Sequence, residues 1–150
     1  MPDVHDAAAR SRNMAAVRGK DTKPELLIRR GLHARGLRFR LHARELPGRP
    51  DLVFPKHRAV LFVHGCFWHG HDCSLFQLPG TRREFWKAKI EGNRARDEKA
   101  LAALRALVWR TGVVWECALR GRDRREPEEV FSACEAWIRR GGADFAVPAP

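Results

Sequence analysis

This 150-residue sequence lacks any apolar run long enough to cross a membrane. A transmembrane helix needs about 20 predominantly apolar residues, and the longest apolar runs here are far shorter. The N-terminal residues 1–6 also lack the apolar core of a signal peptide, so we expect a cytoplasmic protein without a membrane partner. Internal repeats, low-complexity tracts and Ser/Gly linkers are missing as well. We therefore expect residues 1–150 to form a single globular domain.

Acidic residues are few in comparison with basic ones. The sequence contains 18 Asp and Glu against 29 Lys and Arg, which gives a formal net charge of +11. Such an excess produces a long-range field that attracts polyanions, and it is typical of nucleic-acid-binding proteins. Many soluble proteins are basic, so charge alone does not decide the function. The first 20 residues are polar and rich in Lys and Arg, and we expect a basic arm or short basic helix that contacts DNA.

Cysteine is rare, with four residues at positions 66, 73, 117 and 134. In a reducing compartment these thiols are not expected to form disulfides. Cys66 and Cys73 lie inside a histidine-rich stretch, which indicates metal binding instead. We interpret Cys134, on a predicted helix, as a small buried core residue.

Hydrophobic periodicity and turn signals predict the order helix, three strands, helix, strand, helix. Capping-box patterns at residues 22–25 and 81–84 mark the starts of two helices. The continuous apolar run at residues 59–63 is typical of a central strand that is covered on both faces. The predicted elements cover residues 22–36, 37–41, 51–54, 59–63, 81–107, 109–117 and 127–140. This order predicts an α/β fold with a central mixed sheet flanked by helices.

A turn rich in histidine and cysteine, with the sequence HGCFWHGHDC, follows the predicted central strand. A structural zinc ion takes four nitrogen or sulfur ligands in a tetrahedron. Cys66, His71 and Cys73 could supply three of them from one turn, and Cys117 could supply the fourth. His69 lies two residues before His71 and could exchange roles with it, so spacing alone leaves the histidine ligand open. The alternative is that some of these cysteines are merely small buried residues.

Asp51 follows a rigid Gly/Pro turn at residues 47–50 and precedes a strand. The neighbouring apolar strand ends at Val63 and His64. A carboxylate held beside a main-chain carbonyl and an imidazole makes an oxygen-rich pocket that suits Mg²⁺. Alternatively, Asp51 caps the turn, which is a common use of aspartate.

Phe67 and Trp68 lie on a tight polar turn, which is a poor place to bury large aromatic side chains. A wedge that inserts between DNA base pairs explains them better. Met14 and Val17, three residues apart on the basic arm, could insert from the opposite groove, with ordinary core packing as the alternative. We interpret the remaining tryptophans outside the predicted site as core residues, namely Trp109, Trp115 and Trp137.

Six segments together carry a resemblance to a known family. They are residues 3–6, 12–14, 47–51, 64–69, 81–86 and 114–121. In their order and spacing, from about residue 3 to about residue 140, they resemble the very-short-patch mismatch-repair endonucleases. That family has a variant of the restriction-endonuclease fold and nicks one strand beside a T·G mismatch that arises from deaminated 5-methylcytosine. The resemblance implies a restriction-endonuclease-like α/β fold, mismatched double-stranded DNA as substrate, a monomeric state and mismatch-repair proteins as partners.

The resemblance also implies catalytic roles for individual residues. Mg²⁺ would be bound by Asp51 and by the main-chain carbonyl of Val63, where the family pattern has Thr. His69 would be the general base toward the attacking water, and His64 would position the hydrated metal and the phosphate. Glu25 would lie in the outer shell of the metal, although it also fits the last position of a capping box.

The resemblance further implies a structural zinc site and an aromatic wedge. The zinc ligands would be Cys66, His71, Cys73 and Cys117. Trp86 would join Phe67 and Trp68 in the wedge, with core packing as its alternative. Two other functions fit parts of the sequence. A non-catalytic, zinc-stapled DNA-binding module would not need Asp51, and a zinc hydrolase would use His64 and His69 as ligands of a catalytic zinc with an open position.

Overall fold

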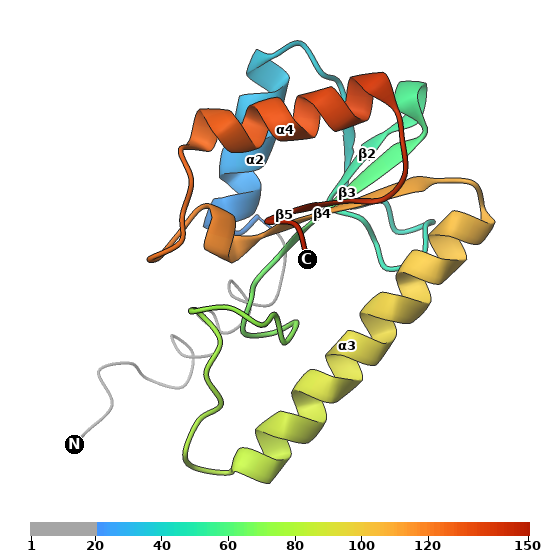
Figure 1. Cartoon of the computed structure of the whole chain (residues 1–150). Helices are drawn as coiled ribbons and strands as arrows, with labels where there is room; N and C mark the ends of the chain where they lie inside the picture. The colour runs from blue at the N-terminus through green and yellow to red at the C-terminus, as the bar shows by residue number, and fades with distance from the viewer. Residues whose placement is uncertain (1–20) are drawn as a thin grey trace.

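The computed structural model describes residues 21–150 and arranges them around a mixed sheet (Figure 1). The strands follow one another in space as they do in the sequence, in the order β1-β2-β3-β4-β5. Their bounds are β1 (Arg40–Leu41), β2 (Leu52–Phe54), β3 (Ala59–His64), β4 (Arg110–Trp115) and β5 (Phe145–Val147). The pairs β1–β2 and β2–β3 are antiparallel, whereas β3–β4 and β4–β5 are parallel. The mixed sheet expected from the sequence is confirmed.

Helices cover both faces of this sheet. Helices α2 (Lys23–Ala34) and α4 (Pro127–Arg140) lie together on one face, and α3 (Arg83–Ala106) crosses the other (Figure 1). Short 3-10 helices η1 (Pro55–His57) and η2 (Glu116–Ala118) follow β2 and β4. Within residues 21–150 no helix combines the length and the apolarity that crossing a bilayer requires.

The apolar run of β3 divides between two cores, as the two-residue period of a strand requires. Ala59 and Leu61 are fully buried in the core beneath α2 and α4. Val60 and Phe62 face the opposite side and pack in a second core with Leu104 of α3. The prediction of a central strand covered on both faces is therefore confirmed, and the strand is extended by one residue to His64.

Both predicted helices are present, but only the first of their two predicted capping boxes forms. Thr22 caps α2, because its hydroxyl accepts a hydrogen bond from the Glu25 N–H at 3.4 Å. Glu25 in return accepts from the Asp21 N–H at 3.2 Å, one residue before the cap. The capping box predicted at residues 81–84 does not form, because the cap of α3 is Arg82, whose left-handed backbone (φ 55°) makes no side-chain cap bond.

Three further details differ from the prediction. The strand expected at residues 37–41 is limited to β1, and the strand expected to reach Cys117 ends at Trp115, so that Cys117 lies in η2. Strand β5 was not predicted, because three residues near the chain end offer too short a pattern for periodicity to be read.

Helix α3 ends in a Schellman motif that contains a valine in place of the usual glycine. The Val108 N–H donates to the Arg105 carbonyl at 2.9 Å, and the Trp109 N–H donates to the Leu104 carbonyl at 3.0 Å. This geometry holds Val108 at φ 65°, a left-handed conformation that is unusual for a β-branched residue. The Val108 side chain is 74% exposed, so little packing compensates for the strain.

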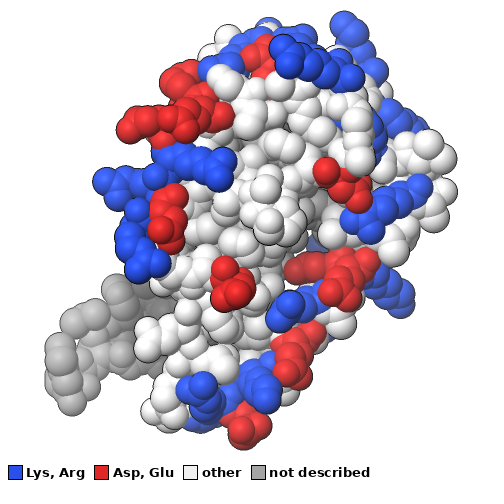
Figure 2. All heavy atoms as spheres, viewed as in Figure 1, with Lys and Arg blue, Asp and Glu red and all other residues white. Residues whose placement is uncertain are grey.

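Charges on the surface are mixed on the face seen in Figure 2, where Lys and Arg side chains are interspersed with Asp and Glu. Arg35 of α2, for example, bonds Glu128 and Glu135 of α4 at 2.8 and 2.9 Å. Arg139 also bonds Glu135, at 2.8 Å. Some of the arginines on this surface are therefore held by acidic partners on the helices.

Candidate functional site

The turn after β3 folds back so that two histidines meet. The His69 N–H donates to the Gly65 carbonyl at 3.2 Å, and the His71 N–H donates to the Cys66 carbonyl at 3.0 Å. As a result the His69 ring stacks on the ring of His64, with centroids 3.8 Å apart and planes within 4°. The structure thus brings together the two histidines that were predicted to act in catalysis.

His64 is held by ring packing. Its side chain is buried, and among residues 21–150 its Nδ1 atom has no hydrogen-bond partner. The ring lies 5.3 Å from Phe62 and 5.2 Å from Trp115, which is its register partner on β4. Burial lowers the pKa of His64 well below its ordinary value, so this imidazole is neutral at neutral pH.

Asp51 lies at the start of β2 and contacts β3 through its side chain. One carboxylate oxygen accepts a hydrogen bond from the Val63 N–H at 2.7 Å, so the carboxylate lies beside the strand end that the sequence pointed to. Burial is the main cause that raises the pKa of Asp51 to about 7. The bond from Val63 opposes this rise, and the charge of Glu25 adds to it. This partly buried carboxylate is well suited to a cation, which would neutralise it.

His42, a histidine that the sequence analysis missed, lies between the carboxylates of Glu25 and Asp51. The Glu25 carboxylate is buried, and one oxygen lies 3.2 Å from Nε2 of His42 and 3.2 Å from Arg29. The other nitrogen of His42 lies 4.0 Å from the Asp51 carboxylate. Asp21 completes this cluster, at 2.8 Å from Arg29. No local pattern in the sequence marks His42, because it lies alone in a basic stretch before the turn.

Asp97 is a second residue that the sequence analysis missed. Its carboxylate, on α3, lies 2.6 Å from Nδ1 of His69. A carboxylate at this nitrogen fixes the orientation of the ring and leaves Nε2 to accept a proton. His64, His69 and Asp97 together form one of the groups that could hold a metal ion. Asp97 has acidic and basic neighbours on a charged helix, so its sequence context is that of a solvent-facing residue.

The second group that could hold a metal contains three cysteines and one histidine. Nδ1 of His71 lies 3.6 Å from Sγ of Cys66 and 3.5 Å from Sγ of Cys117. With Cys73, all four ligand atoms lie within 4.8 Å of one another. The structure therefore groups His71, and not His69, with the cysteines. Burial raises the pKa of the Cys66 and Cys117 thiols, so a bound cation would have to displace their protons.

The remaining cysteine and the other tryptophans lie away from the histidine pair, with one exception. Cys134 is fully buried in the core under α4, and burial raises its pKa to about 12. Trp137 packs in the same core and Trp109 packs against the α3 side. Trp115 also packs there, but its ring stacks on His71, with centroids 4.1 Å apart. Trp115 therefore separates the Cys/His cluster from His64.

The three aromatic residues predicted to form a wedge are in contact with one another. Phe67 lies 5.1 Å from Trp68 and 5.6 Å from Trp86, and the two tryptophans lie 5.8 Å apart. Trp68 is only 9% exposed, contrary to the expectation that this turn cannot bury a large side chain. Phe67 and Trp86 are half-buried and Phe85 is 45% exposed. Met14 and Val17, the other predicted wedge residues, lie outside the described residues.

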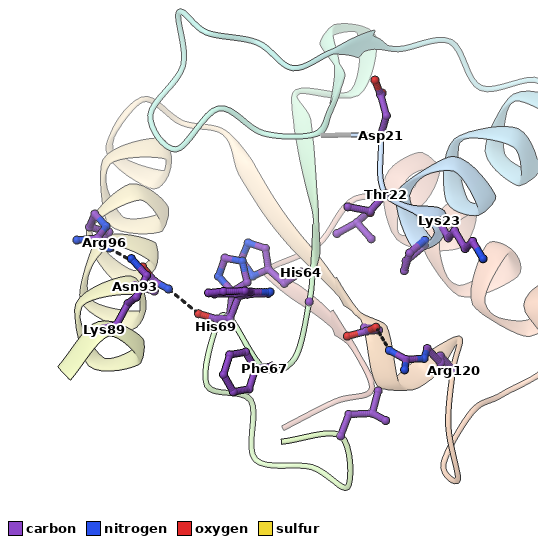
Figure 3. A pocket seen from close by; sticks show the side chains of 16 residues that line it. Asp21, Thr22, Lys23, His64, Phe67, His69, Lys89, Asn93, Arg96 and Arg120 are labelled. Carbon is purple, nitrogen blue, oxygen red and sulfur yellow. Dashed lines mark hydrogen bonds and ion pairs between the residues drawn. The ribbon is translucent and has the colours of Figure 1, made fainter. Parts of the chain in front are cut away.

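A cavity of about 830 Å³ opens beside the histidine pair. Figure 3 shows Lys89, Asn93 and Arg96 reaching it from α3 and the start of α2 facing them, with His64 and His69 between. The Asn93 amide donates to the carbonyl of Trp68 at 2.8 Å, which fixes the turn to α3. The cavity is therefore lined by four Lys and Arg side chains against two carboxylates, Asp21 and Glu116, together with imidazoles and aromatic rings, a combination that suits a polyanion with stacked bases.

An α/β sheet with a partly buried carboxylate, a histidine pair and a separate four-ligand Cys/His cluster is typical of hydrolytic enzymes that bind metal ions. Residues 2–75 match the family model described as DNA mismatch endonuclease Vsr. The chain is 48% identical over 147 residues to the DNA mismatch endonuclease Vsr of Escherichia coli (strain K12), covering 98% of this chain and 94% of that protein. It is 58% identical over 106 residues to the type II nicking enzyme V.XorIIP of Xanthomonas oryzae pv. oryzae, covering 71% and 78% of the two chains. The chain therefore belongs to the DNA mismatch endonuclease Vsr family, as the sequence motifs predicted.

Proposed function

We propose that this protein nicks one strand of duplex DNA beside a T·G mismatch, in very-short-patch mismatch repair. Membership of the family makes it a DNA endonuclease, a hydrolase of phosphodiester bonds. The relative named a nicking enzyme supports cleavage of a single strand. The observation that carries the proposal is the partly buried Asp51 carboxylate, which bonds the end of β3 where His64 stacks on a histidine paired with Asp97.

A hard divalent cation fits the carboxylate side of this site. Asp51 and the main-chain carbonyl of Val63 would hold it, with Glu25 beyond them, and Mg²⁺ is the ion that prefers such oxygen ligands. The raised pKa of Asp51 supports this assignment, because a buried carboxylate without a cation is costly to ionise. When bound, the ion would offset charge on the phosphate oxygens and acidify its water.

The histidines would carry out the proton chemistry. Nε2 of His69 takes the proton from the attacking water, as an imidazole does efficiently near neutral pH. Asp97 holds Nδ1 of the same ring at 2.6 Å and stabilises the imidazolium that forms. His64 stays neutral because it is buried, and its ring keeps His69 stacked in place. From the same position it would help to orient the phosphate and the hydrated cation.

Zinc fits the second group of ligands. Three thiols and one imidazole within 4.8 Å of one another have the number and softness of a closed structural zinc site. We assign the ion to Cys66, His71, Cys73 and Cys117. It would hold the turn on which His69 lies, so that the catalytic ring keeps its position.

The fold and the DNA contacts complete the proposal. We assign the sheet and its helices to a restriction-endonuclease-like fold in one domain that acts as a monomer. Phe67 and Trp86, which are half-buried, would insert beside the mismatch, with Trp68 supporting them from within the cluster. Residues 1–20, including Met14 and Val17, would contact the duplex from the other groove.

A strand-resolved nicking assay tests this function. Duplexes with T·G, other mismatches or a paired T·A at one position, in varied flanking sequence, are labelled on either strand and incubated with and without added Mg²⁺. We expect Mg²⁺-dependent cleavage of one strand of the T·G duplex. Asp51→Asn should bind this duplex and leave it intact. Cleavage without Mg²⁺ would favour a zinc hydrolase, and binding without cleavage would favour a DNA-binding module.

A further inference from the structure

The catalytic residues separate two hollows of different character. The cavity of Figure 3 contains the aromatic residues Phe67 and Trp68. A second groove of about 630 Å³ shares Val63, His64, His69 and Arg96 with it. Asp51 lines this second groove and does not line the first. A strand that reaches both the aromatic cluster and the carboxylate therefore has to pass from one hollow into the other.

Three arginines line the second groove, and none of them forms an ion pair within residues 21–150. Arg44 and Arg49 come from the loop between β1 and β2, and Arg96 comes from α3. The side chain of Arg96 contacts the Asn93 amide oxygen, which leaves its charge without an acidic partner. Several other arginines of the described residues are paired with acids, as Arg105 is with Asp144 at 2.6 Å. Charge without an acidic partner is available to phosphate.

The loop that carries Arg44 and Arg49 is fixed by its own backbone. The Ala43 N–H donates to the Pro50 carbonyl at 3.3 Å, and the Arg49 N–H donates to the Leu46 carbonyl at 3.1 Å. Arg49 adopts a left-handed backbone at φ 50°, a strain that accumulates at binding sites. The loop therefore presents its arginines in a prearranged position.

This loop packs closely against α3 at the base of the groove. At Gly48, where φ is +74°, an added Cβ would lie 2.7 Å from the Cβ of Ala100 and 3.2 Å from the ring of Phe62. Only glycine allows the loop to approach the helix in this way. The arginines of the loop and of α3 thereby face the same hollow.

We propose that this arginine groove, formed by Arg44, Arg49 and Arg96 next to Asp51, binds phosphates of the cleaved strand on the side of the scissile bond away from the aromatic cluster. The inference rests on the proposed nicking function. The three cations counter the repulsion that the Asp51 carboxylate exerts on an approaching phosphate backbone. The strand then runs from the aromatic cluster, past His64 and His69, into the groove.

Salt-dependent binding tests the groove directly. Binding of a T·G duplex is measured by fluorescence anisotropy at several salt concentrations without added Mg²⁺. For Arg44→Gln/Arg49→Gln we expect the slope of log K against log salt to fall by about two, since each lost phosphate contact removes about 0.9. Arg44→Lys/Arg49→Lys should restore most of the slope. Arg140→Gln, on an exposed residue at the end of α4, is the matched control and should keep the parental slope.

Truncated duplexes locate the contact. Shortening the DNA close to the nick, on one side or the other, should weaken binding by the parent in both cases. The double Gln variant should become insensitive to shortening on one side only, which is the groove side. An unchanged slope, or equal sensitivity to both truncations in parent and variant, would overturn the inference. Nicking of the full duplex by the parent is scored separately, so that a failure of the proposed function is distinguished from a failure of the groove.

Discussion

Replacing Asp51 with Asn should stabilise the folded protein while abolishing its nicking activity. Asp51 is a carboxylate that is 18% exposed and whose pKa is raised from 3.8 to about 7, first by burial and then by the charge of Glu25. At neutral and higher pH its ionised form is therefore a cost to the folded state in the absence of a cation. Asn removes the charge and keeps an oxygen that can accept the 2.7 Å hydrogen bond from Val63.

The size of the effect follows from the two pKa values. At about 1.4 kcal/mol per pKa unit, a rise from 3.8 to about 7 corresponds to about 4 kcal/mol of destabilisation by ionised Asp51. The buried amide group of Asn leaves a donor poorly satisfied, which costs about 1–2 kcal/mol. At pH 8 and without added Mg²⁺, we therefore expect Asp51→Asn to raise the free energy of unfolding by about 2–3 kcal/mol.

The difference in unfolding free energy between Asp51→Asn and the parent should depend on pH. Between pH 3.8 and about 7 the folded state retains a proton that the unfolded state has released, so this group makes the parent less stable as pH rises. Below that window Asp51 is protonated in both states, so only the cost of the Asn amide remains and the variant should be less stable than the parent by about 1–2 kcal/mol. Above it the advantage should be complete.

Urea unfolding followed by tryptophan fluorescence at a series of pH values measures this difference. Asp123→Asn is the control, because the pKa of Asp123 is lowered by Ser74 and Arg122, so its variant should gain nothing. Adding Mg²⁺ should stabilise the parent and leave Asp51→Asn unchanged, since the ion binds only the folded carboxylate. The reasoning is refuted if the variant is no more stable than the parent at pH 8.

Three further results are expected. Asp97→Asn should lower kcat by about 10–100-fold, because Asp97 orients His69. KM should change little, because Asp97 is not proposed to contact DNA. An unchanged rate in single-turnover assays would contradict this. Elemental analysis should find about one zinc per chain, and Cys117→Ser should lose the metal and unfold at lower urea concentration; a folded, active variant without zinc would count against the assignment. Val108→Gly should raise the free energy of unfolding by about 1 kcal/mol. The reason is that relief of the left-handed strain is larger than the free-energy cost of the more flexible unfolded chain. An unchanged urea midpoint would show that Val108 is not strained.

Local sequence signals predicted those parts of the fold that depend on neighbouring residues. The apolar run at 59–63 became β3, and the proline at the first position of α4 marked the start of that helix. The capping pattern at 81–84 failed because Arg82 adopts a left-handed backbone, which tertiary context imposes. Burial of Trp68 likewise depends on contacts with Trp86 of α3 that no turn pattern contains.

The candidate site was predictable where its residues are close in sequence. The Cys/His turn indicated the residues that could hold a metal ion, but the choice between His69 and His71 needed the folded turn, in which His69 stacks on His64. Asp97 and His42 could not be predicted from the sequence, because each is a single ionisable residue whose partner lies on another element.

The four-ligand cluster also bears on the order in which the chain folds. Cys66 and Cys73 follow β3, whereas Cys117 follows β4, and the whole of α3 lies in the segment between them. Parallel strands need such a long crossover, and closing it costs chain entropy before any contact repays it. A metal ion on all four ligands would act as a reversible crosslink across this crossover. Refolding should therefore accelerate when the ion is supplied early, and a chain that loses it should open first between β3 and β4.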